Sequence, residues 1–228
     1  MRDREIPWTT DSSKTDWHSV EKTLGIVGKV ERLICEPVAD RAVFICAAVV
    51  WKVNLRRKRH SEILGFQDLG NEKRFLERLA LTGYVPDVLE FVELDSMEAL
   101  CVKRVNGLAL DKYRPGFLEF FLLHFRAARA INEFAKYGVA HGDLAPQNII
   151  IGGSGRLYFI DFGHAYDSPY PIALFRSLFV KRIRHPGFNR PYTVTVVRMI
   201  EFSLPPLFRG PYRKLLRIGK YKSDRPEK

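Results

Sequence analysis

Apolar residues follow two patterns along the chain: short runs in the first hundred residues and helical spacing after them. The runs are rich in Val, Ile, Leu and Cys and are bounded by turn-forming residues, which is typical of buried strands. They cover residues 30–35, 42–53 and 99–105. A helix is predicted between the second and third runs, beginning near Asn71 as its cap, with apolar residues three and four apart at Phe75, Leu76 and Leu79.

The second half of the chain contains the clearest helical signal, over residues 117–136, with Gly138 just past its end. The apolar positions at helical spacing are Phe121, Phe125, Ala128, Ile131 and Phe134. Residues 108–116 are predicted to connect this helix to the strands. Two short strands, 148–151 and 157–160, follow it around a glycine-rich turn. The pattern therefore predicts an α+β fold, with strands first and helices later.

The net charge of +11 is concentrated near the C-terminal end. Residues 165–228 hold 14 Lys or Arg and 4 Asp or Glu, and so account for +10 of it. Basic and large apolar residues alternate over 176–222, which suits a surface lying on an anionic membrane. Packing within the domain is an alternative, and RNA binding is a less favoured one.

The N-terminal residues show no secretion signal, and the longest apolar run, 42–51, is shorter than a bilayer span. We therefore expect a cytoplasmic protein, which would lie on the inner face of the membrane if the basic segment binds there.

One stretch, HGDLAPQNIIIGGSGRLYFIDFG at 141–163, contains the residue types that phosphoryl transfer needs. Asp143 lies in a predicted loop, Asn148 starts one predicted strand and Asp161 follows the next. A tight hairpin would bring the three side chains to one edge. Two carboxylates and an amide form an oxygen donor set suited to Mg²⁺, and a carboxylate beside an acceptor hydroxyl can orient it and take its proton.

This stretch resembles the protein-kinase superfamily, whose catalytic loop has the form His-x-Asp-Leu-x-x-x-Asn and whose metal motif is Asp-Phe-Gly. The resemblance implies a bilobal kinase-like fold that binds ATP and Mg²⁺. Residues 1–107 would form a β-rich N-lobe and residues 108–228 a reduced, helical C-lobe. Asp143 would be the catalytic carboxylate, and Asn148 and Asp161 would bind magnesium.

The resemblance extends upstream to the lysine that binds the nucleotide phosphates. Val49-Val50-Trp51-Lys52 is similar to the kinase strand that carries this lysine, so Lys52 is expected in that role. Glu72, on the predicted helix, is the expected partner that holds Lys52, and Glu62 is the alternative. A solvated strand end and a surface glutamate are the structural alternatives for these charges.

Other residues are expected to surround the nucleotide. Gly25-Ile-Val-Gly28-Lys-Val30 resembles the later part of the kinase glycine-rich loop, although a plain turn is the alternative. Residues 103–107 would form the hinge beside adenine. The complete set of expected nucleotide contacts is Gly25, Gly28, Val30, Val50, Lys52, Lys103 and Val105.

The chain departs from regulated protein kinases after the histidine of the catalytic loop, His141. His141 is expected to hold the loop backbone rather than to transfer protons. Gly142 replaces an arginine that pairs with phosphorylated activation loops, Ala145 replaces a lysine, and no Ala-Pro-Glu motif follows Gly163. These features resemble compact atypical branches: the RIO group, the small kinase of the tRNA-threonylcarbamoylation complex, and bacterial kinases of lipopolysaccharide core sugars.

The expected activity is therefore transfer of the γ-phosphoryl group of ATP to a hydroxyl of a protein Ser or Thr, or of a membrane glycolipid sugar. Two alternatives use the same fold. One is a non-catalytic pseudokinase that binds nucleotide and docks on RNA or membrane. The other is an enzyme that transfers AMP.

Overall fold

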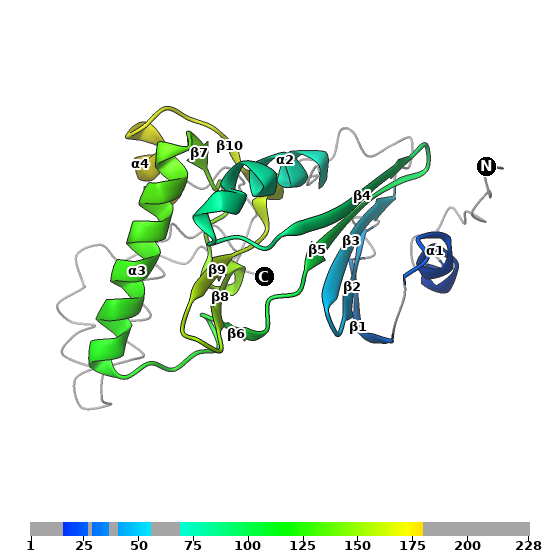
Figure 1. Cartoon of the computed structure of the whole chain (residues 1–228), viewed down its shortest axis with the longest axis horizontal. Coiled ribbons are helices and arrows are strands. Elements are labelled where there is room, and N and C mark those ends of the chain that lie inside the picture. Colours follow the sequence, from blue (N-terminus) through cyan, green and yellow to red (C-terminus); the bar gives the residue numbers. More distant parts are fainter. Residues whose placement is uncertain (1–15, 27–28, 37–40, 56–68, 180–228) are drawn as a thin grey trace, which may run out of the picture.

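The computed structural model describes residues 16–26, 29–36, 41–55 and 69–179 (Figure 1). The helices are α1 (Trp17–Thr23), α2 (Leu69–Leu79), α3 (Phe117–Lys136) and α4 (Ile172–Phe179), with short 3₁₀ helices η4 (Ala80–Thr82), η5 (Pro146–Asn148) and η6 (Phe162–His164). The strands are β1 (Val30–Glu36), β2 (Arg41–Cys46), β3 (Val49–Leu55), β4 (Val88–Leu94), β5 (Met97–Lys103), β6 (Gly107–Ala109), β7 (Val139–Ala140), β8 (Ile149–Gly152), β9 (Leu157–Phe159) and β10 (Tyr166–Asp167). Gly28, Glu62 and residues 180–222 of the basic segment lie outside the described residues.

The first part of the chain forms an antiparallel sheet with the order β1-β2-β3-β5-β4. The predicted single strand over 42–53 is wrong, because an exposed turn at Ala47 and Ala48 divides it into β2 and β3. Arg104 holds this turn: its backbone N–H donates to the Ala48 carbonyl at 2.8 Å and its guanidinium donates to the Cys46 carbonyl at 2.7 Å. Strand β4, which was not predicted, completes the sheet beside β5.

The two faces of the sheet pack against different parts of the molecule. On one face, Phe44, Trp51 and Val53 form an apolar cluster to which α1 contributes Val20. On the other face, Leu100 and other buried residues join the main core, which includes residues of α2 and α3. Because successive side chains of a strand alternate between faces, Lys52 lies on the side opposite Trp51, towards α2.

Helix α2 begins at Leu69, and Asn71 is not its cap, contrary to the prediction. The carboxylate of Glu98, only 4% exposed on β5, accepts the backbone N–H of Leu69 at 3.1 Å. A carboxylate there also interacts favourably with the helix dipole. The Asn71 amide instead donates to the carbonyls of Gly163 and Ala165, at 3.2 and 3.0 Å. Asn71 thus joins α2 to the segment after β9.

Helix α3 has the predicted bounds, and Gly138 follows its end with φ +73°. The predicted inward face is only half right. Ile131 and Phe134 are buried, whereas Phe121, Phe125 and Ala128 are exposed. The remaining positions that the helix buries are Phe120, Leu123, Ala127, Ala130 and Ala135.

Strands β8 and β9 form the predicted hairpin, to which β6 adds a third strand. Strand β6 therefore takes up Gly107 of the predicted hinge and residues 108–109 of the predicted connection, and it pairs with the hairpin rather than with the large sheet. This hairpin lies between the sheet and α3 (Figure 1). Among the described helices, none is both long enough and apolar enough to cross a bilayer.

Candidate active site

An ion-pair centre formed by Lys52, Glu72 and Asp161 joins three elements that are distant in sequence. The Lys52 amine donates to both Glu72 carboxylate oxygens, at 2.7 and 2.9 Å, and to Asp161 Oδ1 at 3.0 Å. Lys52 comes from β3, Glu72 from α2, and Asp161 follows β9. The structure thus brings three of the sequence-predicted residues together. It pairs Lys52 with Glu72, while the alternative, Glu62, lies outside the described residues.

The charges of this centre stabilise one another away from water. Burial alone would lower the pKa of Lys52, but the nearby carboxylates of Asp161 and Glu72 outweigh burial and raise that pKa. Glu72 is only 2% exposed, and burial raises its pKa against the opposing effect of Lys52. Lys52 therefore stays positively charged across the physiological pH range and can bind an anion.

Asp143 and Asn148 meet at the start of the β8–β9 hairpin. The Asn148 amide nitrogen donates to the Asp143 backbone carbonyl at 2.9 Å and to Asp143 Oδ2 at 3.3 Å. The Asn148 amide nitrogen is thereby committed to Asp143, which leaves the amide oxygen to accept a donor or bind a cation. Asp143 and Asn148 form what we call the catalytic-loop pair.

His141 supports the backbone of the catalytic loop, as expected. Its Nε2 bonds with the Ile160 carbonyl at 3.1 Å, and its Nδ1 accepts the Asp143 N–H at 3.4 Å. Burial lowers the pKa of His141, while Asp161 and Asp143 oppose this effect. A neutral ring that donates through Nε2 and accepts through Nδ1 fits both contacts.

Two unusual backbone positions shape the site. Asp161 is the only described non-glycine residue with a positive φ, +69°, a conformation that Asp tolerates better than most residues. Gly142 has φ +76°, and a Cβ there would lie 2.1 Å from the His164 carbonyl oxygen. Gly142 is therefore required by the close approach of two backbone segments, which the sequence showed only as a missing arginine.

The segment after β9 is anchored to the core and to α2. Phe162 is fully buried, 4.4 Å from the His141 ring and 5.7 Å from the Phe134 ring between centroids. Further along, Asp167 forms ion pairs with Arg74 and Arg78 of α2. These contacts, like those of Asn71, were not predicted, because no motif connects exposed charges 89 or more positions apart.

The residues expected around the nucleotide are not all brought together. Gly25, with φ +59°, follows the end of α1 and precedes β1, so it does not lie in a turn between two strands. Val50 packs against the main core, whereas Val30 packs against the cluster on the opposite face of the sheet. Gly28 lies outside the described residues.

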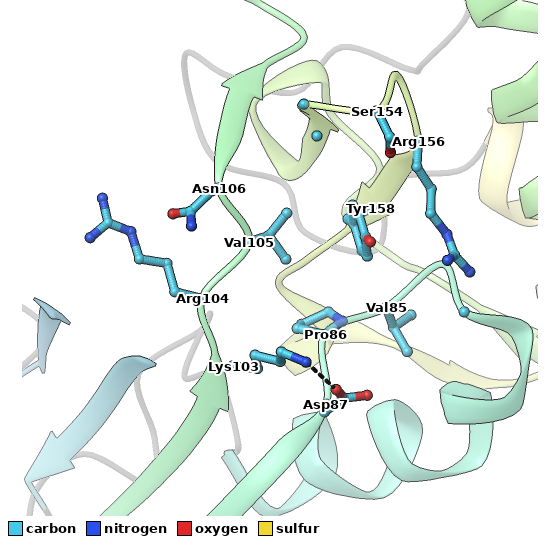
Figure 2. A pocket seen from close by; sticks show the side chains of 13 residues that line it. Val85, Pro86, Asp87, Lys103, Arg104, Val105, Asn106, Ser154, Arg156 and Tyr158 are labelled. Carbon is cyan, nitrogen blue, oxygen red and sulfur yellow. Dashed lines mark hydrogen bonds and ion pairs between the residues drawn. The ribbon is translucent and has the colours of Figure 1, made fainter. Parts of the chain in front are cut away.

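Lys103 and Val105 line a pocket of about 340 Å³ between the hinge residues, the start of β4 and the β8–β9 turn (Figure 2). The Lys103 amine is 3.5 Å from the Asp87 carboxylate within this pocket. No residue of the ion-pair centre or of the catalytic-loop pair lines it. The structure therefore does not bring the side chains of Lys103 and Val105 to the ion-pair centre.

The oxygen donors of the site suit a hard cation with few protein ligands. Within the described part of the chain, no three His, Cys, Asp or Glu side chains cluster in a way that could hold a metal ion. Asp143, Asn148 and Asp161 instead offer two carboxylates and one amide oxygen. Mg²⁺ is usually bound by one or two carboxylates, with phosphate and water completing its octahedron, so these residues fit it.

Comparison with known proteins gives remote similarities. No protein-family model matches the chain. It is 24% identical over 175 residues to the serine/threonine-protein kinase PknD of Protochlamydia amoebophila (strain UWE25), a match that covers 67% of this chain and 16% of PknD. The chain thus spans a small fraction of that curated relative.

Two solved structures of WbdD are similar to the chain. The 2.2 Å crystal structure of WbdD has a TM-score of 0.50 and 20% identity, covering 87% of this chain and 48% of the WbdD chain. WbdD in complex with the kinase inhibitor LY294002 has the same TM-score and identity, covering 86% and 47%. The chain spans about half the length of these structures.

The chain has a protein-kinase-like α+β fold. The sheet order, the ion pair that joins sheet and hairpin, between Lys52 and Asp161, and the structural matches all support this assignment. At this level of sequence identity the solved structures establish the fold alone.

Proposed function

We propose that this protein is an ATP-dependent phosphotransferase that transfers the γ-phosphoryl group to a hydroxyl. The observation that carries the proposal is the ion-pair centre beside the catalytic-loop pair. There a largely buried lysine, whose pKa the neighbouring carboxylates raise, is fixed between Glu72 and Asp161. Phosphoryl transfer depends mainly on positioning and on neutralising charge. This arrangement provides both.

Each residue has a distinct role in the proposal. Lys52 binds the phosphates of the nucleotide, and Glu72 holds the amine in place through two hydrogen bonds. Asp143 orients the acceptor hydroxyl and accepts its proton, while the Asn148 amide fixes the Asp143 carboxylate. Because the pKa of Lys52 is raised, the lysine does not compete with Asp143 as a base.

Asn148 and Asp161 are the residues that would hold Mg²⁺. When bound, the ion neutralises negative charge on the phosphate oxygens. Asp161 Oδ1 already binds Lys52, so this side chain connects the phosphate-binding lysine to the metal-binding end of the hairpin.

The acceptor that we propose is a hydroxyl of a protein Ser or Thr, or of a membrane glycolipid sugar. The similarity to PknD, a serine/threonine-protein kinase, supports the first. The membrane acceptor rests on the basic segment 176–222, of which the structure describes only the first residues. Arg176 already donates to Ser168 at 3.4 Å.

The experiment compares the full chain with Asp143→Asn and Asp161→Asn, which keep side-chain size and remove one charge each. ATP labelled at the γ-phosphate is incubated with separate protein, glycolipid and RNA fractions. We expect label in one hydroxyl-bearing fraction and a rate at least about 10³-fold lower in both variants. Arg32→Gln, at an exposed position on β1, is the control that should keep the wild-type rate.

Wild-type rates in both Asn variants would refute the assignment of these carboxylates. If the chain bound ATP fully but none of the fractions became labelled, the result would indicate the pseudokinase. ATP labelled at the α-phosphate tests the remaining alternative, because only transfer of AMP would leave that label on the acceptor.

A further inference from the structure

A second pocket, of about 410 Å³, lies at the turn of the β8–β9 hairpin and is lined by three arginines. Arg126 and Arg129 come from α3, and Arg156 precedes β9. Ser154 of the turn and Tyr84, between η4 and β4, also line it. Its volume falls within the range of small-molecule sites, roughly 300–1,000 Å³, and we call it the arginine pocket.

The charges of the arginine pocket are not neutralised by the protein. Within the part of the chain that the structure describes, the guanidinium groups of Arg126, Arg129 and Arg156 make no hydrogen bond and no ion pair, and no acidic residue lines the pocket. Other arginines of the described part, such as Arg74, Arg78 and Arg104, each have a carboxylate partner. The three guanidinium groups therefore keep donors that can bind an anion.

Two glycines bring the guanidinium groups close to the turn. Gly83 has φ +66°, and a Cβ on it would lie 1.9 Å from Arg156 Nη2, so the guanidinium occupies the space a side chain would take. A Cβ on Gly155 would lie 3.7 Å from Arg126 Nη1. Arg156 also lies over the Tyr158 ring, 5.6 Å from its centroid. Arg126 thus approaches the turn at Gly155, and Arg156 extends from the turn to Gly83.

The neighbouring pocket that Lys103 and Val105 line, here called the hinge pocket, differs from the arginine pocket because its lysine has a carboxylate partner. It shares Ser154 and Arg156 with the arginine pocket (Figure 2). Its lysine, Lys103, is paired with Asp87, which also lines it. An anion there would meet a carboxylate, whereas in the arginine pocket it would meet only positive and neutral groups.

We propose that the arginine pocket binds a small molecule bearing a phosphate or diphosphate group. Guanidinium groups bind phosphate oxygens through two parallel N–H donors, which makes Arg the preferred residue for such anions. Three of them match the charge of a diphosphate, and the hydroxyls of Ser154 and Tyr84 add neutral donors. None of the residues of the proposed ATP site lines this pocket, so the site does not depend on the proposed function.

The position of the arginine pocket would let a bound ligand connect two elements of the fold. Its turn is the end of the β8–β9 hairpin opposite to Asn148 and Asp161. A ligand held by Arg156 on the hairpin and by Arg126 and Arg129 on α3 would connect the two elements. Because such a ligand binds only the folded chain, it should raise the thermal midpoint in proportion to the logarithm of its concentration.

The test measures binding of pyrophosphate, inorganic phosphate and glucose 6-phosphate to the full chain by calorimetry and thermal shift, without divalent cations. The variant Arg126→Gln/Arg129→Gln/Arg156→Gln removes the three charges. The control Lys22→Gln/Arg32→Gln/Lys112→Gln removes three charges at exposed positions elsewhere. We expect saturable binding that the first variant weakens at least tenfold and the control leaves within twofold.

If the triple variant fails to fold, the single Arg→Gln variants are measured instead. Each should weaken binding, although less than the triple variant would. Equal affinities in the arginine variants and in the control would overturn the proposal, because the ligand would then bind elsewhere, for example at Lys52. Binding to vesicles containing phosphatidic acid, with none to any soluble phosphate, would overturn it as well, since the site would then serve a lipid surface.

Discussion

The two ends of the β8–β9 hairpin differ in charge and in how that charge is compensated. At one end, Asp161 is paired with Lys52 at 3.0 Å, and the Asp143 carboxylate accepts a hydrogen bond from the Asn148 amide at 3.3 Å. At the other end, Arg156 faces Arg126 and Arg129, and no described acidic residue balances them. The strands between these ends are only three and four residues long.

The two ends differ in whether their charged side chains have partners within the protein. Charges with partners form a preformed centre, whereas charges without partners can bind a ligand. Lys52 is held by two carboxylates and is mostly buried, so its position is fixed before any ligand arrives. The arginines are exposed, and their partners must come from solution. Mutations that remove a charge should therefore lower the stability much more at the paired end than at the arginine pocket.

The largest expected effect is from Lys52→Met. This change leaves Glu72, which is 2% exposed, without its counter-charge. Breaking a buried ion pair in this way costs about 4 kcal/mol of unfolding free energy. Arg129→Met, at the other end, should change that free energy by less than about 0.5 kcal/mol, because the side chain has no partner to lose. Urea denaturation followed by circular dichroism measures both values.

Similar losses in the two variants would contradict the contrast between a paired and an unpaired end. A stable Lys52→Met protein would mean that Glu72 takes up a proton at little cost. Its urea midpoint would then fall as the pH rises above about 4.3, the ordinary pKa of Glu, because the folded variant keeps a proton that the unfolded chain loses.

The next effect compares two glycines with nearly equal φ, Gly142 at +76° and Gly155 at +75°. An added Cβ at Gly142 would lie 2.1 Å from a backbone carbonyl, whereas at Gly155 its nearest contact is 3.7 Å away. We expect Gly155→Ala to cost about 1 kcal/mol from backbone conformation alone. Gly142→Ala should cost about 3 kcal/mol, because strain and overpacking combine. Equal costs, measured by the same denaturation, would show that the backbone segments at Gly142 separate easily.

The hairpin could be predicted because its motifs are made of residues close together in sequence. The catalytic loop, the Asp-Phe-Gly motif and the bounds of α3 all follow from residues close together in sequence. A motif of this kind specifies the turn and the strands, and it also predicts the proposed magnesium ligands. The partners Glu72 and Lys52 were also inferred, since family resemblance connects two otherwise separate elements.

Features that depend on distant residues escaped prediction. The break between β2 and β3 contains two alanines, which carry no turn signal, and is held by Arg104 from the hinge. The buried face of α3 was misassigned because the first half of that helix is apolar on nearly every side, so periodicity cannot select a face. Asn71 looked like a cap by its residue type, but Glu98 on β5 occupies that role.

The smallest expected effect is a dependence of the unfolding free energy on pH. It should arise at the Asp143 end of the hairpin and not at the arginine pocket. His141 is buried beside Asp143, and burial lowers its pKa in the folded protein. In the unfolded chain an ordinary histidine has a pKa of about 6.5. Below that pH the unfolded state binds a proton that the folded state excludes, so stability falls as the pH decreases. The arginines of the other end stay charged throughout.

For one proton, the slope of unfolding free energy against pH is at most about 1.4 kcal/mol per unit. The measurement is urea denaturation at closely spaced pH values from about 7.5 down to about 5, above the ordinary range of carboxylates. His141→Gln should be less stable at neutral pH, because it loses contacts in the loop, but its slope should be shallower. His124, whose pKa burial also lowers, is present in both proteins, so the difference between the slopes isolates His141. Parallel slopes would mean that His141 keeps its proton equally well in the folded state, and that the catalytic loop tolerates a charged ring.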